Sequence, residues 1–328
     1  MRRLFLLLLL VAVAVVAFCA LVPTGPSRET FVDIPTGTPT RQISALLKHT
    51  GLIRSELVFD AMHMIRGGTL KAGEYRFDHP AKMAEVYARL RRGDVYTISV
   101  TIPEGSNLFD IAQRIAASGI GSKDAFLAAA RTNVSLIADL DPQASSLEGY
   151  LYPDTYRFSH GTSPLKMQQT MVERFREEAA LLGLQGDDHR VVTLASLVER
   201  ESPIPAERPL VASVFVNRLA KGMPLMTDPS VIYAALLDGR YRGTIYASDL
   251  KADSAYNTYV HTGLPPGPIC SPGADSLKAA MHPAQTDYLY FVAASADPSG
   301  KSRFSATLEE HAHDVAAYRK SLRGTGSR

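Results

Sequence analysis

The chain has 328 residues, of which 46% are hydrophobic and 21% are charged, so it can bury a sizeable core and form two or three compact units. Its 35 basic and 33 acidic residues give a formal net charge of +2 without long runs of one sign. This balance argues against a nucleic-acid-binding protein.

Residues 4–22 (LFLLLLLVAVAVVAFCALV) form an unbroken apolar run behind Met1, Arg2 and Arg3. The run is long enough to cross a bilayer as a helix, and the basic residues predict that the N-terminus is cytoplasmic. A cleaved signal peptide is the alternative, but the run lacks small residues at a cleavage site. We therefore expect an uncleaved single-pass anchor. A disulfide between Cys19, inside this run, and Cys270 is not expected.

After a linker at residues 23–30, two stretches align without gaps. FVDIPTGTPTRQISALLKHTGL matches SVTIPEGSNLFDIAQRIAASGI, with Ile34 opposite Ile102 and Gly51 opposite Gly119, an offset of 68 residues. Each copy predicts a strand, a turn, a helix ending at a glycine and a second helix. Such modules resemble LysM-type peptidoglycan-binding units, and we interpret residues 31–140 as a LysM-like repeat region. A spacer or rigid stalk is the alternative.

From about residue 140 the pattern changes. SSLEGYLYPDTYRF (145–158) places aromatic residues around Glu148, which suits either a sugar-binding surface or an ordinary core turn. Helical patterns follow at residues 164–183, 187–202 and 206–221.

The second of these helices carries two acids, Glu199 and Glu201. Positions two apart on a helix point about 200° away from each other, so the two carboxylates cannot act as a dyad. Glu201 prolongs the apolar stripe and should have a raised pKa, whereas Glu199 is expected to be a semi-exposed surface acid. The alternative for Glu201 is an ion pair with an arginine. The stripe comprises Val191, Leu194, Leu197 and Val198, and the possible partners are Arg190, Arg200 and Arg208.

Further along, MTDPSVIYAAL predicts a helix capped by Thr227 or Asp228, so Asp228 is interpreted as a cap rather than a catalyst. The Gly- and Pro-rich segment at residues 254–277 predicts a rigid loop. Its Tyr256, Asn257 and Tyr259 suit carbohydrate binding, and a purely structural loop is the alternative.

Residues 287–293 predict a buried strand, and residues 306–322 a closing helix. His311 and His313 on that helix face different ways, which argues against a shared metal ion. No cofactor is expected, since the sequence shows no metal cluster, phosphate loop, nucleotide fingerprint or serine triad pattern.

Four ordered blocks carry a resemblance to a known family. They are EGYLYPDTYRF, LASLVERES, VASVFVNRLAKGMPLMTDPSVIY and YNTYVHTGLPPGPICSPGADSLKAAMHPAQTDYLYFV, and together they resemble the YceG-like endolytic murein transglycosylases. The resemblance implies an α+β protein with a transmembrane helix, small LysM-like modules and a helix-rich catalytic domain with a short β-sheet at residues 141–328. It also implies an inner-membrane protein with a periplasmic catalytic domain, with peptidoglycan synthases as further partners.

The activity implied is cleavage of the bond between N-acetylmuramic acid and N-acetylglucosamine inside nascent peptidoglycan strands, leaving 1,6-anhydro ends and limiting strand elongation. The family's catalytic glutamate falls on Glu201, followed by Ser202. Glu148, Tyr256, Asn257, Tyr259 and Ser202 are the expected substrate-binding residues. One rival is a hydrolase pairing Glu201 with Asp228 or Glu148. The other is a non-catalytic, membrane-anchored peptidoglycan-binding scaffold.

Overall fold

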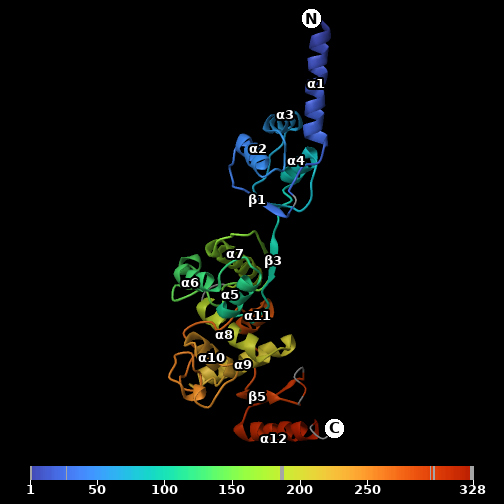
Figure 1. Cartoon of the computed structure of the whole chain (residues 1–328). Helices are drawn as coiled ribbons and strands as arrows, with labels where there is room; N and C mark the ends of the chain where they lie inside the picture. Colours follow the sequence, from blue (N-terminus) through green and yellow to red (C-terminus); the bar gives the residue numbers. More distant parts are fainter. Residues whose placement is uncertain (1, 27, 185–187, 296, 298–299, 326–328) are drawn as a thin grey trace. The chain divides into compact units, whose positions relative to one another are not determined.

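The computed structural model in Figure 1 describes residues 2–26, 28–184, 188–295, 297 and 300–325. The chain is helix-rich, and its strands form the two-stranded pairs β1–β2, β3–β4 and β5–β6. Contacts divide it into two compact units. The smaller comprises Met1–Ile98 with Arg157–Gly161, and the larger comprises Ser99–Tyr156 with Thr162–Arg328.

The smaller unit begins with the apolar helix α1 (Arg2–Leu21), whose length and composition fit a single membrane span. Strands β1 (Thr30–Ile34) and β2 (Gly73–Phe77) then pair antiparallel, with Thr30 opposite Phe77. Helices α2 (Thr40–His49) and α3 (Glu56–Arg66) lie between these strands in sequence, and α4 (Met83–Arg92) follows them. One hydrophobic core joins the sheet to all three helices through residues that include Ile43, Leu47, Phe59, Tyr75 and Leu90.

The larger unit contains the second repeat copy. Its helices are α5 (Leu108–Ala117), α6 (Lys123–Thr132) and a short 3₁₀ helix at Val134–Leu136, and the strands β3 (Ile98–Thr101) and β4 (Thr155–Phe158) have residues in both units. Helices α2 and α5 keep the offset of 68 residues at both ends. The glycines that follow these helices, Gly51 and Gly119, share the left-handed φ values of 74° and 77°. The strand, helix, helix pattern predicted for each copy is therefore present.

The two compact units divide at Ile98, and the catalytic domain expected at residues 141–328 stays a prediction. The second copy belongs with the larger unit because its polar loop is bound there by backbone hydrogen bonds. Gly105 N donates to Ser271 O at 2.9 Å, and Ser271 N donates to Ser106 O at 2.9 Å.

In the larger unit, α8 (Asp188–Glu201) packs against α9 (Arg208–Ala220), α10 (Asp228–Leu237) and α11 (Ala274–Met281). The predicted start of α8 at residue 187 lies outside the described residues. The other elements are α7 (Pro164–Leu182), the 3₁₀ helices Pro205–Glu207 and Asp249–Lys251, β5 (Tyr290–Ala293), β6 (Ser302–Ser305) and α12 (Leu308–Thr325). Strand β5 was expected to be buried but is half-buried, because its described partner is β6 alone.

Candidate active site

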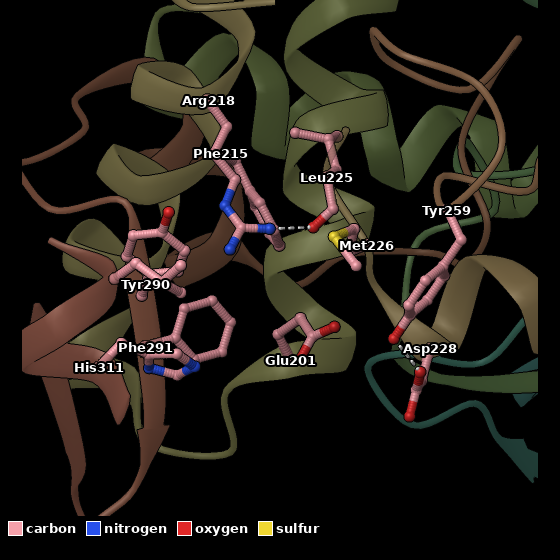
Figure 2. A pocket seen from close by; sticks show the side chains of 11 residues that line it. Glu201, Phe215, Arg218, Leu225, Met226, Asp228, Tyr259, Tyr290, Phe291 and His311 are labelled. Carbon is pink, nitrogen blue, oxygen red and sulfur yellow. Dashed lines mark hydrogen bonds between the residues drawn. The ribbon is translucent and has the colours of Figure 1, made fainter. Parts of the chain in front are cut away.

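An open cavity of about 460 Å³ lies where the C-terminal end of α8 meets the start of α10 (Figure 2). Aromatic side chains, two carboxylates and one guanidinium line it. The lining residues are Glu201, Phe215, Arg218, Leu225, Met226, Asp228, Tyr259, Tyr290, Phe291, Leu308 and His311.

Glu201 is the last residue of α8, and its carboxylate accepts a hydrogen bond from Thr227 Oγ1 at 2.5 Å. Burial raises the pKa of Glu201, and the Asp228 carboxylate raises it further, while the Thr227 hydroxyl and Arg218 act in the opposite direction. The negative end of the α8 dipole also disfavours a carboxylate at this position. Glu201 therefore holds its proton to a higher pH than an exposed glutamate does.

Thr227 is available to Glu201 because the backbone around it is fixed by other groups. Its hydroxyl does not cap α10, although it occupies the N-cap position. Thr227 N donates to Thr258 Oγ1 at 3.0 Å, and Met226 N donates to Thr258 O at 3.0 Å. Met226 has a φ of 53°, a left-handed conformation that costs a non-glycine residue about 1–3 kcal/mol. The segment at Met226 and Thr227 is thus hydrogen-bonded to Thr258 and held in a strained geometry directly beside Glu201.

Arg218 places a cation on the opposite wall of the cavity. Its Nε donates to Leu289 O at 2.7 Å and its Nη1 to Leu225 O at 2.8 Å, as Figure 2 shows for Leu225. The guanidinium lies 5.3 Å from the Tyr290 ring centroid. These neutral partners orient Arg218, and no carboxylate of the described residues forms an ion pair with it.

Aromatic rings and Asp228 complete the cavity. Tyr259 Oη donates to Asp228 Oδ1 at 2.6 Å. Phe215 and Phe291 meet edge to face with centroids 6.2 Å apart. Rings of this kind offer apolar faces against which sugar rings can stack, beside groups that hydrogen-bond hydroxyls.

Glu199 lies in a different environment from the one expected. Its side chain is only 5% exposed and pairs with Arg208, which is 6% exposed, at 2.9 Å. Its second oxygen accepts from Gly273 N at 3.0 Å. The expectation of a semi-exposed acid was wrong because α8 is buried on all sides from Val192 to Val198. The ion pair considered for Glu201 belongs to Glu199.

Two of the expected sugar-binding residues lie away from the Glu201 cavity. Glu148 is 3% exposed and accepts from Leu108 N at 3.0 Å at the start of α5, and burial raises its pKa to about 8. The Tyr256 ring packs on Tyr233 with centroids 5.0 Å apart. Tyr256 lines a separate cavity of about 270 Å³ together with Phe109 and Tyr233.

Two further expected residues hold local structure. Asn257 is fully buried, and its Nδ2 lies within 2.8–3.2 Å of three backbone carbonyls, those of Asp249, Leu250 and Ala252. Ser202 is buried in a turn where Ile204 N donates to its Oγ at 3.3 Å. Their polar atoms serve the fold because both segments are irregular and need partners for their backbone groups.

Of the expected residues, Glu201 and Tyr259 share the cavity, and Asp228, interpreted as a cap, joins them there. Sequence reasoning missed Thr227 as a partner of Glu201, and it missed Arg218 altogether. The signal available for Thr227 was its hydroxyl group directly before Asp228 and Pro229. The same pattern predicts a helix N-cap, so it does not single out a partner of Glu201. Arg218 falls near the end of an apolar helix, where a basic residue ordinarily needs no further explanation.

A helix-rich fold with an acid of raised pKa in an aromatic-walled cavity has the arrangement of an enzyme that uses general acid chemistry. The chain belongs to the YceG-like family, whose model matches residues 32–317.

Relatives support this assignment. The chain is 35% identical over 303 residues to an endolytic murein transglycosylase of Bacillus subtilis, covering 85% of this chain and 82% of the relative. It is 29% identical to an endolytic murein transglycosylase of Streptococcus pneumoniae, of which it spans 60%. The crystal structure of a yceG-like protein from Listeria monocytogenes matches with a TM-score of 0.56 and 33% identity, covering 88% of this chain and 99% of that one.

Proposed function

We propose that this protein is an endolytic lytic transglycosylase that cleaves the bond between N-acetylmuramic acid and N-acetylglucosamine inside nascent peptidoglycan strands. The observation that carries the proposal is the half-buried Glu201 carboxyl group, whose pKa is raised by desolvation, in the lining of the cavity. Family membership and the names of the relatives point to the same substrate.

In the first step, Glu201 donates its proton to the glycosidic oxygen as the bond to the muramic acid C1 breaks. A neutral carboxylic acid is required, and burial favours that form of Glu201 by raising its pKa. Positive charge then develops on the sugar ring. The Glu201 carboxylate left behind is stabilised by the Thr227 hydroxyl and by the charge of Arg218.

In the second step, the C6 hydroxyl of the same muramic acid attacks C1, and Glu201 takes the hydroxyl proton. The product carries a 1,6-anhydro ring, and the enzyme returns to its starting protonation state. The substrate supplies the nucleophile, so a second protein carboxylate is not needed for bond formation. Asp228 and Tyr259 are placed to hydrogen-bond sugar hydroxyls at the cavity rim.

Asp228 also supports one rival. It lines the same cavity as Glu201, so a hydrolase that uses both carboxylates and a water molecule is chemically possible. Glu148 is the weaker choice for that second acid, because it lies outside the cavity lining and caps the start of α5.

The remaining parts of the proposal concern location. Helix α1 anchors the chain in the inner membrane, the larger unit acts in the periplasm, and its cleavage limits strand elongation beside peptidoglycan synthases. If a repeat binds glycan in the manner of LysM units, the first copy is favoured. Its loop at Pro35–Gly37 is exposed, whereas Gly105 and Ser106 in the second copy are buried.

The test is mass spectrometry of the products formed by the whole protein from uncrosslinked glycan strands in ¹⁸O-labelled water. We expect 1,6-anhydromuramic ends without ¹⁸O, since no water enters the product. Reducing ends carrying ¹⁸O would establish the hydrolase. Intact strands after incubation with protein that binds them would favour the non-catalytic scaffold.

A further inference from the structure

Helix α3 of the smaller unit carries an apolar face that the fold leaves uncovered. Leu57, Met64 and Ile65 are 79%, 79% and 85% exposed. Together with Ala61 they follow the i, i+4, i+7, i+8 spacing of a single helix face. The helix does not need this face for its own packing, because Phe59 is fully buried in the core and Val58 and Met62 pack against that core.

We propose that this face of α3 lies in the lipid headgroup and upper acyl region of the membrane, beside the anchor helix. The inference rests on the proposed membrane anchoring by α1 and adds a second membrane contact to it. Exposed apolar patches of this kind mark interaction surfaces.

Continuity with α1 identifies lipid as the occupant. Val16 and Ala20 of α1 and Leu57, Ala61 and Ile65 of α3 line one apolar groove of about 380 Å³. Val16 lies five residues before Leu21, the last residue of α1, which at 1.5 Å per residue is about 7.5 Å inside the end of the span. Helices that lie in a membrane surface bury their apolar face about 5–10 Å deep. The part of α3 that shares the groove with Val16 therefore lies at the depth in the membrane that is typical of helices lying in its surface.

Basic residues at this junction fit the headgroup level. Arg54 Nη1 donates to Val22 O at 2.6 Å and Nη2 donates to Pro23 O at 3.1 Å, just beyond the end of α1. The guanidinium also lies 4.7 Å from the Phe18 ring centroid. Arg66, at the end of α3, lines the groove. Long basic side chains at a membrane boundary keep their charge in the headgroup region while their stems contact apolar groups.

Two polar residues of α3 have partners in the smaller unit, and the half-buried Asp60 lies at the edge of the apolar face. Glu56 pairs with Lys48 of α2 at 3.0 Å, and His63 Nδ1 lies 3.2 Å from Tyr87 Oη. The centre of the surface offered to the membrane is thus apolar, with Arg54, Arg66 and the half-buried Asp60 at its margin, as in helices that lie on membranes.

The absence of tryptophan from the sequence gives a direct test. Three single-tryptophan variants of the whole chain, Ile65→Trp, Gln42→Trp and Val11→Trp, would be reconstituted in phosphatidylcholine nanodiscs holding one chain each. Gln42 is an exposed residue of α2 and serves as the matched control, and Val11 lies within α1. Emission would be compared in discs with and without bromine atoms on the upper acyl chains.

We expect a blue-shifted emission for Ile65→Trp that is lost in brominated discs, and a water-like, unquenched emission for Gln42→Trp. A water-like emission from Ile65→Trp would overturn the inference when Val11→Trp shows its usual lipid environment. A blue shift that appears only when many chains share one vesicle, and is absent from discs holding one chain each, would assign the face to a second copy and also overturn the inference. A water-like emission from Val11→Trp would instead overturn the anchoring itself.

Discussion

The surroundings of Glu199 and of Glu201 differ although both acids belong to the last turn of α8. Glu199 is held by the Arg208 guanidinium and by Gly273 N, so its charge is compensated inside the protein. Glu201 receives one hydroxyl hydrogen bond and faces a cavity together with a second carboxylate. A compensated buried acid stabilises the fold, whereas an uncompensated one keeps its proton and can give it to a substrate. The following predictions test this difference.

The largest effect is expected for Glu201→Gln. Glutamine keeps the shape and can accept the Thr227 hydrogen bond, but it cannot transfer a proton. General acid–base groups contribute about 10²–10⁴-fold to a rate, so release of anhydromuramic ends should fall by that order, as measured by chromatography of the products. Thermal unfolding should stay close to that of the unaltered protein, and a variant with normal turnover would remove Glu201 from the mechanism.

Glu199→Gln should act mainly on stability. The substitution leaves Arg208 buried without its main partner, and breaking a buried pair from one side costs about 3–5 kcal/mol. Glu104, 3.7 Å from Arg208, can offset part of the loss, so the lower end of this range is expected in urea unfolding. An unchanged midpoint would show that the pair contributes nothing to the fold.

A third acid, Glu148, sharpens the comparison because it is buried outside the cavity. Its folded-state pKa of about 8 lies above the ordinary value of 4.5. The neutral Glu148 carboxyl group therefore makes its full contribution to the free energy of unfolding below about pH 4.5. As the pH rises toward about 8, the free energy of unfolding falls by a few kcal/mol. Glu148→Gln should be more stable relative to the unaltered protein at pH 9 than at pH 5. Urea unfolding at both values measures this, and parallel curves would contradict the raised pKa.

The smallest effect is expected for Thr227→Val, which removes the hydrogen bond that favours the Glu201 carboxylate. The pKa of Glu201 should rise further, because the Thr227 hydroxyl lowers it in the intact site. As the active form is the protonated acid, the alkaline limb of the pH–rate profile should move to higher pH. A limb that stays in place would mean that another group controls it.

The sequence predicted much of this fold because its periodic segments are long and their boundaries are marked. The span of α1, the duplicated helices α2 and α5, and the bounds of α7, α8 and α9 all follow from apolar spacing, glycines and caps. It also led to Glu201, but partly for an incorrect reason. The helical pattern suggested that Glu199 was on a polar face, and that face is buried by α11 and the segment around Ile269 and Cys270.

The remainder of the site depends on contacts between distant segments. Thr227 meets Glu201 across 26 residues, and Arg218 is oriented by Leu289 across 71. Asn257 looked like a sugar-binding amide, yet its amide nitrogen is surrounded by the carbonyls of residues 249–252, and tertiary folding sets this position. Local spacing carries no information about any of these pairings.

The most direct measurement is the rate of glycan cleavage per folded molecule for Glu201→Gln and Glu199→Gln, assayed together on the same strands with the folded fraction of each determined by circular dichroism. The account predicts that Glu201→Gln is folded and inactive, while Glu199→Gln is less stable but retains cleavage in the molecules that remain folded. An active Glu201→Gln, or a fully folded Glu199→Gln that has lost cleavage, would contradict it.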